Sequence, residues 1–220
     1  GGGGSFFVSD ARQWSDTGGE DIVDYLNAGS TAITANLNLT TAQNTGFGTH
    51  SFSNVEGLAG GSGADTFTDS AVDNLFEGRG GNDTFNLTNG GNDTLTYNVL
   101  AANGTGGNGA DTVNGFWVGA YLATANADRI DVSELLIGYT EDADGPARYV
   151  NGVATLDAGE TIGNYLSLQN FSGNSAQLFI DRDGAGAAYN SELLLTINFA
   201  NATPTAEVLT EMLANQQFVL

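Results

Sequence analysis

Apolar residues recur about every nine positions through the middle of this chain, and polar turns rich in glycine separate them. Gly60 to Thr68 reads Gly-Gly-Ser-Gly-Ala-Asp-Thr-Phe-Thr, and Gly106 to Asn114 reads Gly-Gly-Asn-Gly-Ala-Asp-Thr-Val-Asn. Both fit the repeat Gly-Gly-x-Gly-x-Asp-x-U-x, in which U is apolar. Residues of a strand face alternate sides, so the last three residues of each unit predict a short strand with U inside. The predicted inward residues are Phe67, Phe76, Phe85, Leu95 and Val113.

Each unit also places a polar residue at its sixth position. These residues are Asp65, Asn74, Asp83, Asp93 and Asp111. Asp65 and Asp83 are 18 residues apart, as are Asp93 and Asp111, which equals two units. With half a coil per unit, we expect Asp65 and Asp83 on one edge of a stack, and Asn74, Asp93 and Asp111 on the other. Glycine turns that expose backbone carbonyls beside carboxylates provide the oxygen ligands that calcium prefers.

These units resemble the repeats of the RTX (repeats-in-toxin) family, whose members form a parallel β-roll with calcium ions between successive turns on each edge. The resemblance implies an all-β-dominated fold, a calcium-bound parallel β-roll (β-solenoid) that binds several calcium ions. It also implies ligands by position, because the carbonyls of positions one and three act with the Asp of one turn. The carbonyls of positions two and four, together with the Asp, are the calcium ligands from the next turn on that edge.

Two calcium sites follow from this resemblance. The first set of ligands is Gly60, Ser62, Asp65, Arg79, Gly81 and Asp83. The second set is Thr88, Gly90, Asp93, Gly107, Gly109 and Asp111.

Further metal-ligand candidates lie outside these two sets. Residues 51–59 keep the repeat frame, with Glu56 at the sixth position and Leu58 at the eighth, so the stack is expected to begin before the glycine signal. The unit at 69–77 adds Asp69, Asp73 and Asn74. Asp181 and Asp183 stand in Asp-Arg-Asp-Gly between two predicted strands. That sequence indicates either an isolated calcium turn or a turn whose carboxylates accept local backbone amides.

The flanking segments predict a cap at each end of the repeats. Residues 1–5 read as a linker, 6–59 as N-terminal capping strands and lead-in coils, 60–114 as the repeat block, and 115–220 as a C-terminal α+β cap. In the first cap, Ile33, Leu37 and Leu39 are expected on one face of a strand. In the second, we expect a short helix at 134–137 capped by Ser133, strands at 176–180 and 192–199, and a terminal helix that opens at Thr203.

The C-terminal segment 127–220 resembles the targeting region of large RTX adhesins that type I secretion exports. The resemblance rests on Asp128-Arg-Ile-Asp-Val-Ser-Glu-Leu-Leu136, on Ile180-Asp-Arg-Asp-Gly-Ala-Gly186 and on residues 209–220. It implies that the end of the chain is recognised by a type I exporter.

Composition narrows the classes of partner. The chain has 26 acidic and 5 basic residues, a net charge of −21. Without a Lys or Arg cluster to neutralise phosphates, we exclude a nucleic-acid binder and expect cations instead. The sequence contains no cysteine and no stretch that resembles a membrane span. His50 is the one histidine, and neither a Gly-x-Ser-x-Gly nor a His-Glu-x-x-His motif occurs, so no catalytic residue is predicted.

Two functions from different classes remain. The first is a non-catalytic, calcium-binding C-terminal module of a secreted bacterial RTX adhesin, located at the cell surface. It would fold on external calcium, act as a monomer, carry the secretion signal, and adjoin upstream domains that contact surface glycans. The alternative is an accessory carbohydrate-binding module of a secreted polysaccharide-modifying enzyme. Such a module should present basic and aromatic side chains along the repeats, where Arg79 is the only basic residue. The first function is therefore favoured.

Overall fold

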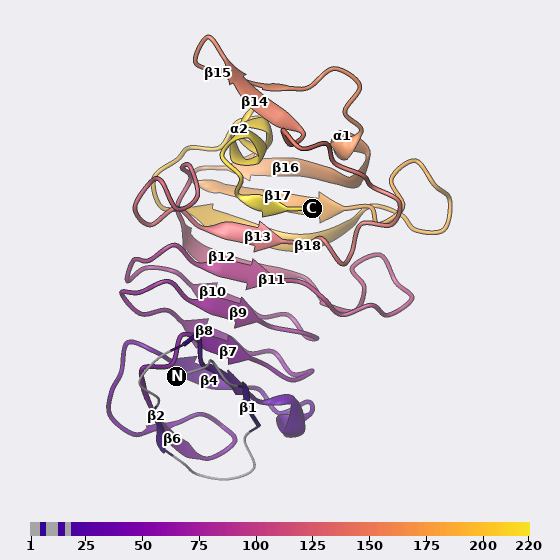
Figure 1. The fold of residues 1–220 in the computed structure, drawn as a ribbon. Helices are drawn as coiled ribbons and strands as arrows, with labels where there is room; N and C mark the ends of the chain where they lie inside the picture. Colours follow the sequence, from indigo (N-terminus) through magenta and orange to yellow (C-terminus); the bar gives the residue numbers. More distant parts are fainter. Residues whose placement is uncertain (1–4, 8–12, 16–18) are drawn as a thin grey trace.

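Most strands belong to two sheets of seven strands each (Figure 1). Residues 5–7, 13–15 and 19–220 are described in the computed structural model. The first sheet contains, in spatial order, β1 (Ser5–Phe7), β3 (Ile22–Asp24), β7 (Gly57–Ala59), β9 (Leu75–Glu77), β11 (Thr94–Thr96), β13 (Arg129–Asp131) and β19 (Phe218–Val219). All of its neighbouring strands run parallel.

The second sheet combines parallel and antiparallel strands. Its order is β16 (Leu166–Ser172), β17 (Ser175–Ile180), β18 (Glu192–Phe199), β12 (Asp111–Phe116), β10 (Thr84–Asn86), β8 (Thr66–Thr68) and β4 (Thr34–Asn36). The strands from β18 to β4 are parallel, whereas β16, β17 and β18 are antiparallel. From β7 to β13, successive strands alternate between the two sheets. The chain is therefore dominated by β-structure with parallel sheets.

The remaining elements lie toward the ends of the stack (Figure 1). They are β2 (Gln13–Ser15), β6 (Thr49–Ser53) and β5 (Gln43–Asn44) in a three-stranded sheet, the hairpin of β14 (Ala147–Val150) and β15 (Val153–Leu156), and the helices η1 (Leu26–Ala28), α1 (Ile162–Tyr165) and α2 (Val208–Ala214). Among the described residues, no helix is both long and apolar enough to cross a membrane.

The apolar residues of the repeats meet between the two sheets. Phe67 pairs with Phe85 and Phe85 with Val113 in one sheet, and Phe76 pairs with Leu95 in the other. All five side chains are at most 1% exposed. Burying each one stabilises the fold by about 1.5 to 3 kcal/mol relative to leaving it in water. The predicted inward positions are thus confirmed, and Leu58, which pairs with Phe76, confirms that the stack begins before the glycine signal.

A glutamine side chain covers the outer edge of β4. The Asn36 backbone N–H donates to Gln43 Oε1 at 2.9 Å, and Gln43 Nε2 donates to the Asn36 carbonyl at 2.8 Å. The amide of Gln43 thereby replaces the neighbouring strand that a parallel sheet would otherwise require at its edge. This contact gives the N-terminal cap a specific hydrogen-bonding role.

Several predicted elements differ in detail from the structure. Residues 134–137 form no helix, because the Ser133 hydroxyl donates to Asp131 Oδ1 at 2.7 Å and closes a turn instead of capping a helix. Leu39 is 45% exposed, since β4 ends at Asn36. The terminal helix begins at Val208 rather than Thr203. Ser5 belongs to β1, whereas the rest of the predicted linker lies outside the described residues.

Candidate metal centres

Three aspartates form a column along the edge where the chain passes from the first sheet to the second. Asp65 Oδ1 accepts the Ile33 N–H at 2.7 Å, and Asp83 Oδ1 accepts the Asp65 N–H at 2.7 Å. Asp111 Oδ1 accepts the Asp83 N–H at 2.8 Å. Each carboxylate therefore binds the backbone of the preceding coil. We call Asp65, Asp83 and Asp111 the first column; all three are at most 2% exposed.

Two of the three second carboxylate oxygens in this column lack a hydrogen-bond partner, whereas Asp65 Oδ2 accepts the Gly61 N–H at 2.9 Å. Within the described part of the chain, Asp83 Oδ2 and Asp111 Oδ2 are buried without a hydrogen-bond partner, as is the Tyr97 hydroxyl, which lies near enough to Asp111 to oppose the rise in its pKa. A Cβ at Gly78 would collide with Asp83 Oδ2, so glycine allows this turn to approach the carboxylate closely. A buried, unpaired carboxylate oxygen is costly, and a bound cation would remove that cost.

The pKa values of these carboxylates reflect the same shortage of positive partners. Burial raises the pKa of Asp83 to about 7 and that of Asp111 to about 8; repulsion from Asp65 adds to the shift of Asp83, and repulsion from Asp83 and Asp65 adds to that of Asp111. Burial also raises the pKa of Asp65, although backbone N–H groups partly oppose the shift. In contrast, the pKa of Asp24 lies below its usual value, because hydrogen bonds from Arg79 and the Leu26 N–H outweigh the opposing effect of burial.

A second column follows the opposite edge, and it consists of Asn74, Asp93 and Asp128. Asp93 Oδ1 accepts the Asn74 N–H at 2.8 Å, and Asp128 Oδ1 accepts the Asp93 N–H at 3.1 Å. Asp128 Oδ2 accepts the Trp117 N–H at 2.8 Å. Burial raises the pKa of Asp93 to about 8 and the pKa of Asp128 well above its usual value. A cavity of about 190 Å³ adjoins both carboxylates and is also lined by Thr88 and Gly90.

The prediction that Asp93 and Asp111 share one edge is wrong. β12 pairs with β10, which places Asp111 beside Asp83, and Asp128 occupies the position next to Asp93. The predicted partners of Asp111 move with it, because a Cβ at Gly109 would collide with the carbonyl of Gly81 on the first edge. The second predicted ligand set therefore does not form one site.

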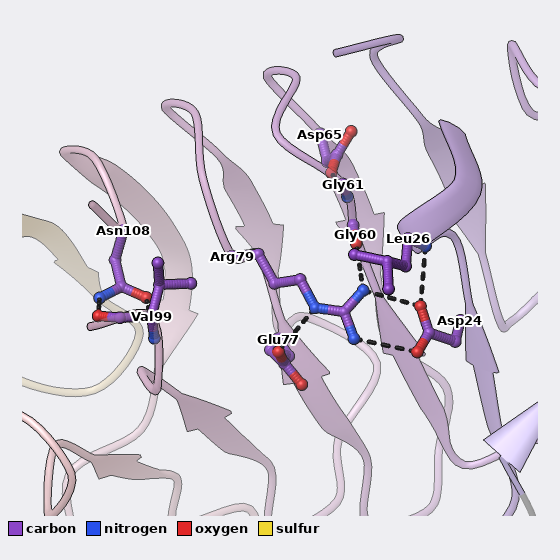
Figure 2. Close-up of polar contacts among 9 residues, drawn as sticks. All are labelled: Asp24, Leu26, Gly60, Gly61, Asp65, Glu77, Arg79, Val99 and Asn108. Carbon is purple, nitrogen blue, oxygen red and sulfur yellow. Dashed lines mark hydrogen bonds and ion pairs between the residues drawn. The ribbon is translucent and has the colours of Figure 1, made fainter. Parts of the chain in front are cut away.

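The loop of residues 97–110, between β11 and β12, explains why Asp111 lies on the first edge and not the second. The Asn108 amide accepts the Val99 N–H at 3.2 Å and donates to the Val99 carbonyl at 3.0 Å, so the loop makes its hydrogen bonds internally at this point (Figure 2). Buried Arg182 donates to the carbonyls of Ala101 at 2.8 Å and Asn103 at 3.1 Å. Residues 97–110 consequently add no strand to either sheet, and the nine-residue count loses its structural meaning there.

Asp128 is the site residue that the sequence prediction missed. The sequence does carry a signal for it, since Asp128-Arg-Ile130 has an aspartate two positions before an apolar residue, as in four of the five repeat units. Ile130 pairs with Leu95 and is fully buried, as the eighth position of a unit requires. Without glycines in residues 123–127, this unit does not match the repeat.

The other candidates accept backbone hydrogen bonds, three of them from residues 19 to 35 positions away in the chain. Asp69 Oδ2 accepts the Asn89 N–H at 2.8 Å, and Asp73 Oδ1 accepts the Asn92 N–H at 2.8 Å. Glu56 Oε2 accepts the Asp21 N–H at 3.0 Å, and Asn74 Oδ1 accepts the Ser70 N–H at 2.7 Å.

Asp181 and Asp183 lie in the loop after β17. The Asp183 carboxylate accepts the N–H groups of Ala188 at 2.9 Å and Tyr189 at 3.2 Å. These contacts fit the turn interpretation for Asp183, whereas Asp181 Oδ1 is buried without a hydrogen-bond partner among the described residues, as expected of a metal ligand, so both interpretations of Asp181-Arg-Asp-Gly184 stand.

His50 is a packing residue in this structure. It is fully buried, and its Nδ1 lies 2.8 Å from the Tyr25 hydroxyl and 3.2 Å from Thr45 Oγ1. Over the described ranges, no three acidic or histidine side chains gather closely enough to hold a metal by side chains alone. No family model matches the sequence, and no curated protein is significantly similar to it.

Acid should stabilise this fold, because protonation removes the charge of its buried carboxylates. Burial raises the pKa values of Asp83, Asp93 and Asp111 from the ordinary 3.8 to about 7 or 8, so the folded chain binds more protons than the unfolded chain between these pH values. Without divalent cations, stability should therefore be highest near pH 4 and fall as the pH rises through 8. Thermal unfolding in chelator across this range measures the effect. A midpoint that stays constant or rises with pH contradicts it, and Asp83→Asn with Asp111→Asn should flatten the profile.

Proposed function

We propose that this chain is a calcium-binding β-roll in which ions bind between successive turns along both columns. The sites would use Asp65 with Asp83, Asp83 with Asp111, and Asp93 with Asp128, each completed by backbone carbonyls of the adjoining turns. The observation that carries the proposal is the pair of buried, unpaired oxygens, Asp83 Oδ2 and Asp111 Oδ2. Oxygen ligands in a negatively charged, glycine-rich setting fit a hard divalent cation of the size of calcium.

The arrangement of strands supports the β-roll. Parallel strands alternate between two sheets, and equivalent turns stack along each edge, where backbone approaches backbone. A Cβ at Gly81 would collide with the Gly63 carbonyl, and one at Gly91 would collide with the Val72 carbonyl. Such close stacking brings carbonyl oxygens of successive turns near the carboxylate columns. A site built mainly from backbone carbonyls needs only two carboxylates.

The resemblance to RTX adhesins extends the proposal to a biological role. The chain would be a non-catalytic C-terminal module of a secreted surface adhesin, acting as a monomer, folding on external calcium and carrying a type I secretion signal. Its net charge of −21 supports the first part, because several bound calcium ions would neutralise much of that charge. A low calcium concentration inside the cell would keep most of the stack unfolded and the chain competent for export.

Double mutants test the sites and the register together. Asp83→Asn and Asp111→Asn should be non-additive in calcium affinity, with a coupling energy of about 1 to 3 kcal/mol, because both remove a ligand from the same site. Asp93→Asn and Asp111→Asn should be additive within about 0.5 kcal/mol, since these residues lie on opposite edges. Asn keeps an Oδ1 acceptor for the backbone N–H groups, so folding is little disturbed.

Isothermal titration calorimetry with calcium measures both cycles, and Glu134→Gln provides a control that removes one exposed negative charge. Additivity of Asp83→Asn with Asp111→Asn would overturn the shared site. A wild-type chain that binds no calcium would overturn the proposed function.

A further inference from the structure

Arg79 reaches across three adjacent strands of the first sheet (Figure 2). It follows β9, and its guanidinium forms a fork with Asp24 at the end of β3: Nη1 donates to Oδ1 at 2.7 Å and Nη2 to Oδ2 at 2.9 Å. Nη1 also donates to the carbonyl of Gly60, just after β7, at 2.8 Å. Nε donates to Glu77 Oε1 at 2.8 Å. Four oxygens from three neighbouring strand ends therefore surround one positive charge.

The geometry requires arginine specifically. A planar guanidinium donates to both oxygens of one carboxylate while its Nε serves another, whereas a lysine ammonium group cannot form that fork. The Arg79 side chain is only 18% exposed, so solvent screens these contacts incompletely. Its backbone φ is +65°, a conformation that glycine adopts readily and arginine does not. The contacts of the side chain must offset this conformational cost.

We propose that Asp24, Gly60 and Glu77 form a cation site that the chain fills with its own Arg79, so that β3, β7 and β9 are held together without a metal ion. The first column lies on the same edge: Asp65 is near enough to Arg79 for the guanidinium charge to oppose the rise in its pKa, whereas Asp83 Oδ2 and Asp111 Oδ2 are unpaired among the described residues. One end of the stack would then keep its structure at a low calcium concentration, while the coils beyond it depend on bound metal.

Hydrogen exchange in chelator tests this inference residue by residue. The Tyr25 N–H donates to Ala59 and the Gly60 N–H to Glu77, both at 2.8 Å, so these amides report the pairing of the three strands. The Leu87 and Tyr97 amides report the later coils, because they donate to Asn114 and Asp131. Without calcium, we expect Tyr25 and Gly60 to exchange at least about 10-fold more slowly than Leu87 and Tyr97.

Three variants separate the cation from general effects of charge. Arg79→Gly should abolish the extra protection of Tyr25 and Gly60 while relaxing the backbone at this position. Arg79→Lys keeps the charge without the fork and should retain only part of the protection. Arg148→Gln removes an equal charge from the exposed pair with Asp157 and should leave the protection unchanged. Equal exchange at Tyr25 and Leu87 in wild type, or unaltered protection in Arg79→Gly, would overturn the proposal.

Adding Ca²⁺ to the Arg79→Gly chain tests whether these oxygens can bind a cation. Arg79→Gly leaves two carboxylates and a carbonyl around one position, so millimolar Ca²⁺ should restore protection of Tyr25 and Gly60 in this variant. Protection that Ca²⁺ fails to restore would mean that the oxygens are no cation site. The wild-type and Arg79→Gly chains are compared in chelator, so that comparison stands even if the wild-type chain binds no calcium and the proposed function fails.

Discussion

Removing calcium should abolish most of the β-sheet signal of this chain at neutral pH. The two columns bury carboxylates that then have no counter-ion, and the glycine-rich turns regain a large conformational entropy. Three sites that bind calcium at 100 times their dissociation constant would contribute about 8 kcal/mol in total. The net stability of a typical domain is about 5 to 15 kcal/mol, so losing this contribution is enough to unfold the later coils.

Far-UV circular dichroism with chelator, followed by return of calcium, measures the change. Magnesium at the same concentration should restore little of the signal, because it keeps its waters and needs a stricter octahedral geometry than stacked turns provide. An unchanged β signal after complete removal of calcium would contradict calcium-gated folding. If only the coils around Arg79 persist, the residual signal should disappear in Arg79→Gly.

Deleting residues 203–220 should abolish export by a type I secretion system while sparing the first column. The deleted segment contains α2 and β19; β19 is the last strand of the first sheet, whereas Asp65 and Asp83 precede β8 and β10, nearer the other end of the stack (Figure 1). It also contains Gln217, whose Nε2 donates to the carbonyls of Trp117 at 2.8 Å and Asp128 at 2.7 Å. We therefore expect loss of the proposed calcium site at Asp93 and Asp128 in addition to loss of export.

Gln217→Ala distinguishes a secretion signal from a simple cap. This variant removes the contacts with Trp117 and Asp128 but leaves α2 and the final residues in place, so it should lower the thermal midpoint without blocking export. Assays of secreted protein and of thermal unfolding in calcium, made on both variants, provide the comparison. Normal export of the 203–220 deletion, combined with reduced stability, would assign the segment to capping alone.

Local repetition explains why much of the stack could be predicted. Each inward residue, such as Phe67 or Phe85, lies in a short unit whose strand and turn are specified by its own residues. The contact between Asp65 and Asp83 follows from two such units in sequence, and the structure confirms it. No distant contact is needed to predict these features.

Features that depend on distant contacts escaped prediction. The repeat count places Asp111 on the wrong edge, because residues 97–105 have the length of one nine-residue unit but form no strand. Arg182, about 80 residues later in the chain, binds the loop that contains them. Arg79 was expected to offer its carbonyl to calcium. Its side chain instead meets Asp24, 55 residues earlier, and only the folded stack places the two side by side.

The pairing of β12 with β18 has a consequence for the order of folding. Within the repeats, hydrogen-bonded neighbours such as Asp65 and Asp83 are separated by 18 residues, whereas Asn114 and Asn198 of β12 and β18 are separated by 84. The entropy lost on closing a loop grows with the logarithm of its length, and contacts between distant residues slow folding. The coils of the repeats should therefore form first, and β12 then provides the strand edge with which β18 pairs. The C-terminal strands should join last, and their docking should limit the overall rate.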